Sequence, residues 1–168
     1  MNVIGIVGWK NSGKTTLASA LIRELCNRGL TVNSIKHAHH MVDVDQPGTD
    51  SYKHRDAGAR EVILAGGQRF AIMHELRGAQ EPTLDELLAR LGPCDWVVVE
   101  GFKTHPHPKI EVHRRDSSRS PLYLEDASIV AVAADYAADF TGAVFDLNDV
   151  PAIADFILSR EKPGTEDQ

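Results

Sequence analysis

The segment with the clearest chemical potential lies near the N-terminus and reads Gly8-Trp9-Lys10-Asn11-Ser12-Gly13-Lys14-Thr15. It matches the pattern G-x-x-x-x-G-K-[ST], in which the glycines allow close backbone approaches that a Cβ atom would obstruct. Successive N–H groups can then converge on phosphate oxygens, helped by the positive end of a helix dipole. Lys14 would place its charge against the β- and γ-phosphates, and the Thr15 hydroxyl would bind Mg²⁺. The segment predicts a nucleoside triphosphate site running from Gly8 through Thr16 rather than a glycine-rich turn with a chance lysine.

A second candidate ligand follows the apolar run 96–99, which ends in Glu100 and Gly101. A magnesium triphosphate site also needs an acid, usually at the end of a neighbouring buried strand. Gly101 would let the chain turn away beneath the phosphates. We therefore predict that Thr15 and Glu100 serve the metal, although Asp is the commoner residue here. The alternative is that Glu100 is simply the first exposed residue after a strand.

The acidic stretch 43–50 contains Asp43, Asp45 and Asp50 and leads into a predicted helix. In one interpretation Thr49 or Asp50 caps that helix and the other acids are solvated. In the other, Asp50 approaches Mg²⁺ or orients water, which would place it with Lys14 and Glu100 among the catalytic residues.

Two histidine clusters and one basic cluster each have more than one interpretation. The histidines could be solvated loop residues, contacts for an anionic ligand or, since imidazole is a common ligand, a metal site. The arginines could form a solvated face or a lid or subunit contact on phosphates. These residues are His37, His39, His40, His105, His107, His113, Arg114, Arg115 and Arg119.

The elements that must position these residues alternate between strands and helices. Expected helices cover 14–28, 50–57, 83–91 and 149–158, and expected strands cover 2–7, 30–36, 95–100, 110–113 and 128–133, with a hairpin over 61–65 and 69–75. Such alternation favours a three-layer α/β fold, with a mostly parallel mixed sheet covered by helices on both faces. We expect the hairpin to contribute one antiparallel addition. Residues 1–160 should form a single nucleotide-binding domain, and 161–168 a polar tail.

Composition excludes several classes of protein. The 168 residues carry a net charge of −6 with 6% aromatic residues, which argues against nucleic-acid binding. Apolar runs are far shorter than the ~20 residues of a membrane helix, and the N-terminus has no signal-peptide pattern. The two cysteines, Cys26 and Cys94, form no disulfide framework. A reducing cytoplasm fits these features.

Taken together, the chain resembles the molybdopterin-guanine dinucleotide biosynthesis adaptor (MobB) family over nearly its whole length. The resemblance is carried by the phosphate-loop motif through Thr16, by segments 35–37, 47–59 and 99–103, and by the late segment 145–149. The phosphate loop alone is shared by many unrelated proteins. The middle block and the Val-Glu-Gly-Phe-Lys run are the specific part.

The resemblance implies a P-loop NTPase-like protein that binds GTP with Mg²⁺, hydrolyses it weakly and forms a homodimer. It also implies a partner, a MobA-type nucleotidyltransferase that joins GMP to molybdopterin to give the guanine dinucleotide form of the molybdenum cofactor. The histidine-rich and basic loops become candidates for contacts with the pterin or the partner enzyme. The Asn-Lys-x-Asp signature for guanine is absent, and residues 146–149 match it only loosely. A small-molecule kinase or ATP-dependent ligase is the alternative function, and a phosphate-binding scaffold without triphosphate specificity is a third.

Overall fold

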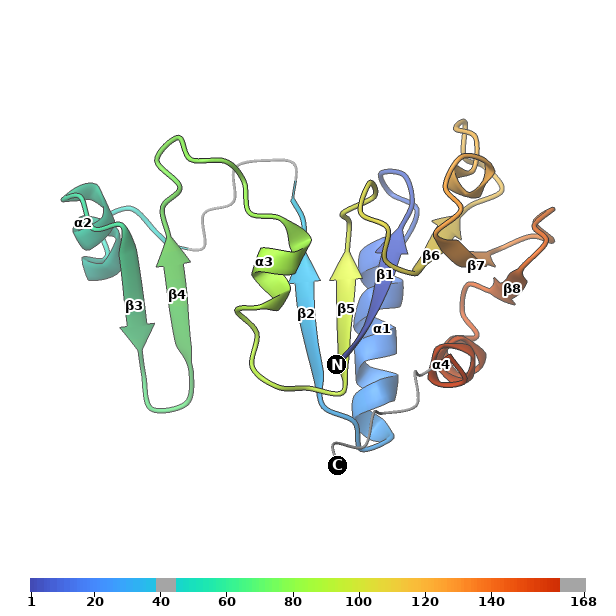
Figure 1. The fold of residues 1–168 in the computed structure, drawn as a ribbon, viewed down its shortest axis with the longest axis horizontal. Helices are drawn as coiled ribbons and strands as arrows, with labels where there is room; N and C mark the ends of the chain where they lie inside the picture. The colour runs from blue at the N-terminus through green and yellow to red at the C-terminus, as the bar shows by residue number, and fades with distance from the viewer. Residues whose placement is uncertain (39–44, 161–168) are drawn as a thin grey trace, which may run out of the picture. The chain divides into compact units, whose positions relative to one another are not determined.

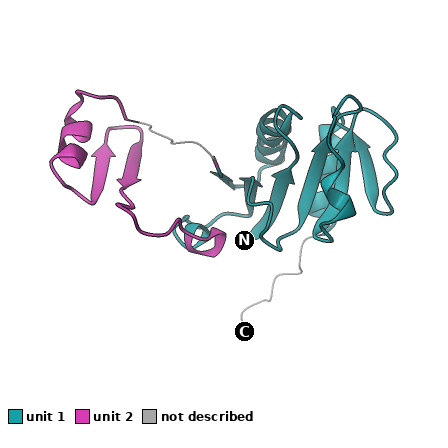
Figure 2. Ribbon diagram, turned by 90° about the horizontal axis from the view of Figure 1, so that it is seen from above, with its two compact units in different colours: residues 1–37, 87–168 teal, residues 38–86 magenta. Residues whose placement is uncertain are grey.

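The computed structural model describes residues 1–38 and 45–160, and these form two compact units (Figure 2). The first unit, the sheet unit, comprises residues 1–37 and the chain from residue 87 onward. The second, the hairpin unit, comprises residues 38–86. The predicted tail 161–168 lies outside the described residues. That residues 1–160 act as one nucleotide-binding domain stays a prediction.

The sheet unit is built on a six-stranded sheet with the order β2-β5-β1-β6-β7-β8 (Figure 1). Its strands are β1 (Asn2–Val7), β2 (Val32–Lys36), β5 (Trp96–Glu100), β6 (Lys109–His113), β7 (Ile129–Ala134) and β8 (Ala143–Asp146). All neighbouring pairs are parallel, so the carboxyl ends of β1, β2 and β5 meet at one edge. The predicted α/β fold is therefore confirmed. Strand β8 was not predicted, because its four residues show no clear alternation.

One face of this sheet packs against α1 (Lys14–Asn27) and α4 (Val150–Leu158) in a continuous apolar core. Helix α1 contributes Leu17, Leu21 and Leu25, which recur at helical spacing and are fully buried. Helix α4 begins where Asp149 accepts a hydrogen bond from the N–H of Ala152, and Pro151 occupies its first turn. The core therefore fixes the direction of α1, whose N-terminus follows the phosphate loop.

The opposite face of the sheet carries buried polar residues on β6. Strand alternation places Lys109, Glu111 and His113 on this face, and all three are buried. The Glu111 carboxylate accepts hydrogen bonds of 2.8 and 2.9 Å from the N–H groups of Leu122 and Tyr123, at the start of the short 3₁₀ helix η1 (Leu122–Leu124). The buried charge thus anchors the loop after β6 to the sheet.

The hairpin unit contains α2 (Asp50–Asp56), β3 (Glu61–Ala65) and β4 (Phe70–His74). The predicted hairpin is confirmed, with Ile63 opposite Ile72, but it forms its own two-stranded antiparallel sheet instead of joining the parallel one. Among the described residues no helix is long and apolar enough to cross a membrane.

Helix α3 (Leu84–Leu88) is shorter than the predicted 83–91. Its capping box is present: the Thr83 N–H donates to Glu86 at 2.8 Å, and the Glu86 N–H donates to the Thr83 hydroxyl at 3.3 Å. The helix tightens into turns at Arg90 and Leu91, because the following Gly-Pro sequence cannot continue it.

The buried ammonium of Lys109 generates a stability prediction. It lies 2.9 Å from Asp126 Oδ2 and also donates to Ser128. Burial acts to raise the pKa of Asp126, but hydrogen bonds from Ser128 and Lys109 outweigh it and hold the pKa below its ordinary value. The carboxylate therefore stabilises the fold above pH ~4, and this contribution is lost as the pH falls through the folded-state pKa.

We expect Asp126→Asn to lower the free energy of unfolding by about 3 kcal/mol at pH 7, since it leaves a buried charge uncompensated. Urea denaturation checks this, with Glu125→Gln, an exposed acid of the same loop, as control. A stability equal to the control's would show that the Lys109–Asp126 pair is dispensable.

Candidate functional site

The phosphate loop, residues 8–15, connects β1 to α1 through backbone angles that glycine favours. Gly8 and Gly13 have φ values of 147° and 103°, and Asn11 has a φ of 63°. A Cβ atom on Gly8 would lie 2.4 Å from the carbonyl oxygen of Val112 on β6. The predicted need for glycine at residue 8 therefore has a steric cause, the close approach of β6. The first N–H groups of α1 have no intrahelical acceptor, so the loop and helix start present donors suited to an anion.

Lys14 folds back over this loop. Its ammonium donates a 2.6 Å hydrogen bond to the carbonyl oxygen of Trp9. Partial burial lowers the pKa of Lys14, and the nearby charges of Lys103 and Lys36 lower it further, against the opposing effect of Glu100. An anion in the loop would relieve this repulsion between like charges.

Glu100 and Thr15 meet at the start of α1, and their predicted service to a metal stays a prediction. The Thr15 hydroxyl donates to Glu100 Oε1 at 2.7 Å. Lys36 at the end of β2 completes the group: its ammonium lies 3.2 Å from Thr15 Oγ1 and 3.4 Å from Glu100 Oε2. A hydroxyl and a carboxylate are the hard oxygen donors that Mg²⁺ prefers. The Lys36 ammonium already places a positive charge beside both groups. These residues fit a magnesium ion.

The chain turns sharply immediately after Glu100. Gly101 has a φ of 103°, and a Cβ there would lie 2.8 Å from the Cβ of His37. The His37 ring stacks on Phe102 with centroids 4.5 Å apart. Gly101 is therefore required for the turn, and His37 packs against this turn and Phe102.

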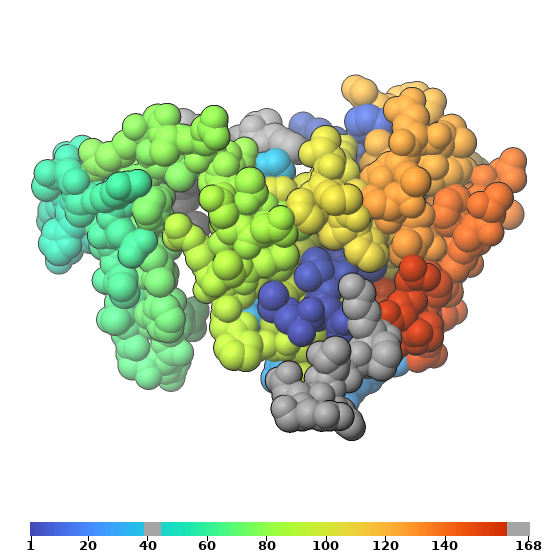
Figure 3. Space-filling view, in the orientation of Figure 1, coloured from blue at the N-terminus to red at the C-terminus, as the bar shows by residue number. Residues whose placement is uncertain are grey.

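Trp9 connects the phosphate loop to both neighbouring loops. Its indole N–H donates to the carbonyl oxygen of Ser120 at 2.9 Å, and its ring lies 4.3 Å from the ammonium of Lys103 and 4.8 Å from the guanidinium carbon of Arg119. Figure 3 shows blue atoms of the N-terminal segment beside orange atoms of the loop after β6. Two cations thus lie against one aromatic ring of the phosphate loop.

The three arginines of the predicted basic patch have different surroundings. Arg114 Nε donates to the carbonyl oxygen of Ser12 at 3.1 Å, so it supports the phosphate loop directly. Arg119 lies against Trp9. Arg115 instead lies over the ring of Tyr136, with its N–H bonded to Asp135. Two of the three arginines therefore border the phosphate loop.

The histidines have separate structural roles. His105 and His107 contact each other, with 3.1 Å between their Nδ1 atoms, and burial lowers the pKa of His107 to about 4. His113 bridges Tyr136 and the Arg119 carbonyl oxygen. Across residues 1–38 and 45–160, no three His, Cys, Asp or Glu side chains are grouped to hold a metal ion. His39, His40 and Asp43 lie outside the described residues.

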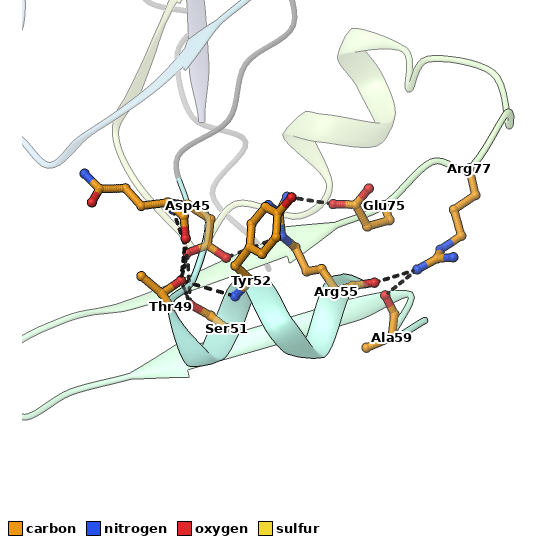
Figure 4. Close-up of polar contacts among 9 residues, drawn as sticks. Asp45, Thr49, Ser51, Tyr52, Arg55, Ala59, Glu75 and Arg77 are labelled. Carbon is orange, nitrogen blue, oxygen red and sulfur yellow. Dashed lines mark hydrogen bonds and ion pairs between the residues drawn. The ribbon is translucent and has the colours of Figure 1, made fainter. Parts of the chain in front are cut away.

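Segment 47–59, the middle block of the resemblance, takes part in a polar network within the hairpin unit (Figure 4). Thr49, not Asp50, caps α2 by accepting from the Tyr52 N–H. Asp45 accepts from the Thr49 and Ser51 hydroxyls, and Arg55 lies 3.4 Å from Asp45 and 2.8 Å from Glu75. Asp50 is 92% exposed and pairs with Lys53. A catalytic role for Asp50 stays a prediction.

Residues that sequence reasoning left without a role include Lys36 and Lys103. Lys36 pairs in register with Glu100 across β2 and β5, a relation that depends on sheet order. Its position at the carboxyl end of a predicted strand was the available signal. Lys103 was visible only as part of the Val-Glu-Gly-Phe-Lys run.

Comparison with known proteins identifies the family to which the chain belongs. Residues 3–135 match the family model "MobB: Molybdopterin guanine dinucleotide synthesis protein B". The molybdopterin-guanine dinucleotide biosynthesis adapter protein of Haemophilus influenzae is 43% identical over 157 residues, covering 92% of this chain and 86% of the relative. That of Escherichia coli is 40% identical over 159 residues, covering 93% and 91%.

A crystal structure of molybdopterin-guanine biosynthesis protein B superposes with a TM-score of 0.76 at 28% identity, covering 95% of this chain and 99% of the other. A MobB homologue from Bacillus stearothermophilus gives 0.69 at 27% identity, covering 95% and 97%. The chain therefore belongs to the molybdopterin guanine dinucleotide synthesis protein B (MobB) family.

Proposed function

We propose that this protein is a GTP-binding adapter of molybdopterin-guanine dinucleotide biosynthesis that assists a MobA-type nucleotidyltransferase. The single observation that carries the nucleotide part is the phosphate loop with Lys14 over it and the Thr15–Glu100 pair at its edge. The adapter part is supported by family membership and by the printed names of relatives 43% and 40% identical.

The chemistry of binding follows from these side chains. Loop amides would hold the β- and γ-phosphates of GTP, and Lys14 would neutralise their charge. Thr15 and Glu100 would hold Mg²⁺ or its waters. When bound, the ion would supply charge neutralisation between the phosphates. Preference for guanine rests on the family, since the sequence has no base-reading signature.

Hydrolysis should be slow. The Thr15–Glu100 hydrogen bond commits that carboxylate to the metal side of the site. The sequence offers no residue that is an obvious strong base, and a GTPase without an arginine finger supplied by a partner loses about 10³–10⁵ in turnover. Asp50, our candidate for orienting water, would position it only loosely, because its side chain is 92% exposed. Transfer of phosphoryl groups to a small molecule would instead favour the kinase alternative.

We also propose a homodimer, supported by the bare apolar face of the hairpin. Strand pairing places Ile63, Phe70 and Ile72 on one side, where they are 60, 68 and 54% exposed. On the other side Val62 and Met73 are buried, and Leu64 is 55% exposed. A two-stranded sheet is marginally stable alone, and apolar faces of this kind mark association surfaces. In the expected homodimer, a second copy of the chain would cover this apolar face.

The cytoplasm stays the expected compartment. Cys26 and Cys94 are both free thiols, which suits a reducing environment. We expect the molybdenum cofactor precursor and the nucleotidyltransferase to meet the protein there.

The nucleotide site is tested by Lys14→Ala. The loss of one charged contact to phosphate should weaken Mg²⁺-dependent GTP binding by about 10- to 100-fold without unfolding the protein. Isothermal titration with GTP, GDP and ATP, with and without Mg²⁺, measures this. The control is Arg23→Ala, an exposed cation of the same helix. Unchanged GTP affinity in Lys14→Ala would refute the assignment.

The homodimer is tested by Ile72→Asp. A charge on the exposed apolar face should shift the protein to a monomer in sedimentation velocity, raising the dimer dissociation constant at least about tenfold. Leu124→Asp, which places the same charge on a residue 66% exposed in the sheet unit, should leave association unchanged. If Ile72→Asp sediments like the wild type, this face does not hold the dimer.

A further inference from the structure

A cavity of about 310 Å³ lies beside the phosphate loop, between it and the loop after β6. Lys10, Asn11 and Ser12 form one wall. The other wall includes His113, Arg114 and Arg119, with serines at 117 and 118. This volume is at the lower end of those that hold small ligands. All of its lining residues belong to the sheet unit.

The charges around this cavity are not balanced. Lys10, Arg114 and Arg119 line it with a single carboxylate, Asp116. In the described part of the chain, no carboxylate lies within ion-pair distance of Lys10 or Arg119, whereas Arg114 lies 3.4 Å from Asp135. This gathering of cations occurs in a chain whose net charge is −6. Such an excess raises the local concentration of anions.

Lys103 does not line the cavity, but it lies against the same Trp9 ring as Arg119. Burial lowers the pKa of Lys103, and the charge of Arg119 lowers it further. The two cations are therefore close enough to repel each other while both contact the same indole. Binding of an anion beside Arg119 would offset this repulsion.

The wall that carries Arg119 is held in place by buried groups. His113 is 6% exposed, and its ring contacts the Tyr136 hydroxyl at 2.7 Å and the Arg119 carbonyl oxygen at 3.2 Å. Ser117 accepts from the Arg119 N–H at 3.2 Å, and the Trp9 indole holds Ser120. Arg119 is thus presented by a fixed backbone, and little ordering is needed on binding.

We propose that this cavity is a second phosphate site, in which Arg119 binds a terminal phosphate dianion. The proposal rests on the proposed function, because the phosphate loop forms one of the two walls. The dianion has two possible sources, the terminal phosphate of the bound nucleotide or the phosphate monoester of a second small molecule. Guanidinium is suited to either, since its planar donors match phosphate oxygens.

Calorimetric titration of the full chain separates the two sources. Inorganic phosphate and ribose 5-phosphate are titrated into protein saturated with Mg²⁺ and either GDP or a non-hydrolysable GTP analogue. Binding to the GTP-analogue complex, whether or not the GDP complex also binds the probes, assigns the site to a second molecule. Binding to the GDP complex alone assigns it to the terminal phosphate of the nucleotide.

Variants of Arg119 test whether this side chain binds the phosphate probes. Arg119→Gln should raise the dissociation constant of the phosphate probes about tenfold or more, and Arg119→Lys should restore much of the loss because it keeps the charge. Arg115→Gln is the matched control, an arginine of the same loop that does not line the cavity. GDP affinity reports whether the phosphate loop remains intact in each variant.

The inference is overturned if neither complex binds the probes, or if Arg119→Gln binds them as tightly as Arg115→Gln. If Lys14→Ala nevertheless loses GTP binding, the nucleotide site is still supported, and only the second phosphate site is refuted. Unchanged GTP binding in Lys14→Ala would instead remove the proposed function first.

Discussion

The start of helix α1 sets the main constraint on this protein, because its first N–H groups have no acceptor within the helix. The core of the sheet unit fixes the helix axis, and the approach of β6 to Gly8 fixes the path of the loop before it. The Lys14 ammonium donates to the carbonyl oxygen of Trp9, but it offers no acceptor to these N–H groups. An anion is the ligand that complements both the unpaired amides and the surrounding cations. The proposal of a nucleotide site rests on this local arrangement.

Support for the loop comes from an unusual distribution of polarity across the sheet. One face of β6 is apolar and packs on the helices, while the other buries Lys109, Glu111 and His113. Buried polar groups are retained only when they are hydrogen-bonded, and here their partners are backbone and side-chain groups of the loop that carries Arg119. The same strand therefore forms the core and positions the basic wall beside the phosphate loop.

Local sequence patterns predicted those parts of the fold that depend on local physics. Strand β1, helix α1 and the hairpin could be placed because their periodicity and glycine stops are strong, and Glu100 could be linked to Thr15 because parallel strands end at one edge. Lys36 could not be given a role, since its contact with Glu100 depends on β2 lying next to β5. The separate pairing of the hairpin, the short strand β8 and the contacts of Trp9 likewise depend on tertiary packing.

A crystal structure of the protein with Mg²⁺ and a non-hydrolysable GTP analogue would test the phosphate loop most directly. We expect the β- and γ-phosphates to lie among the amides of residues 8–15, the Lys14 ammonium to move from the Trp9 carbonyl to phosphate, and the metal to lie beside Thr15. An empty loop, or a nucleotide bound elsewhere on the chain, would contradict this expectation.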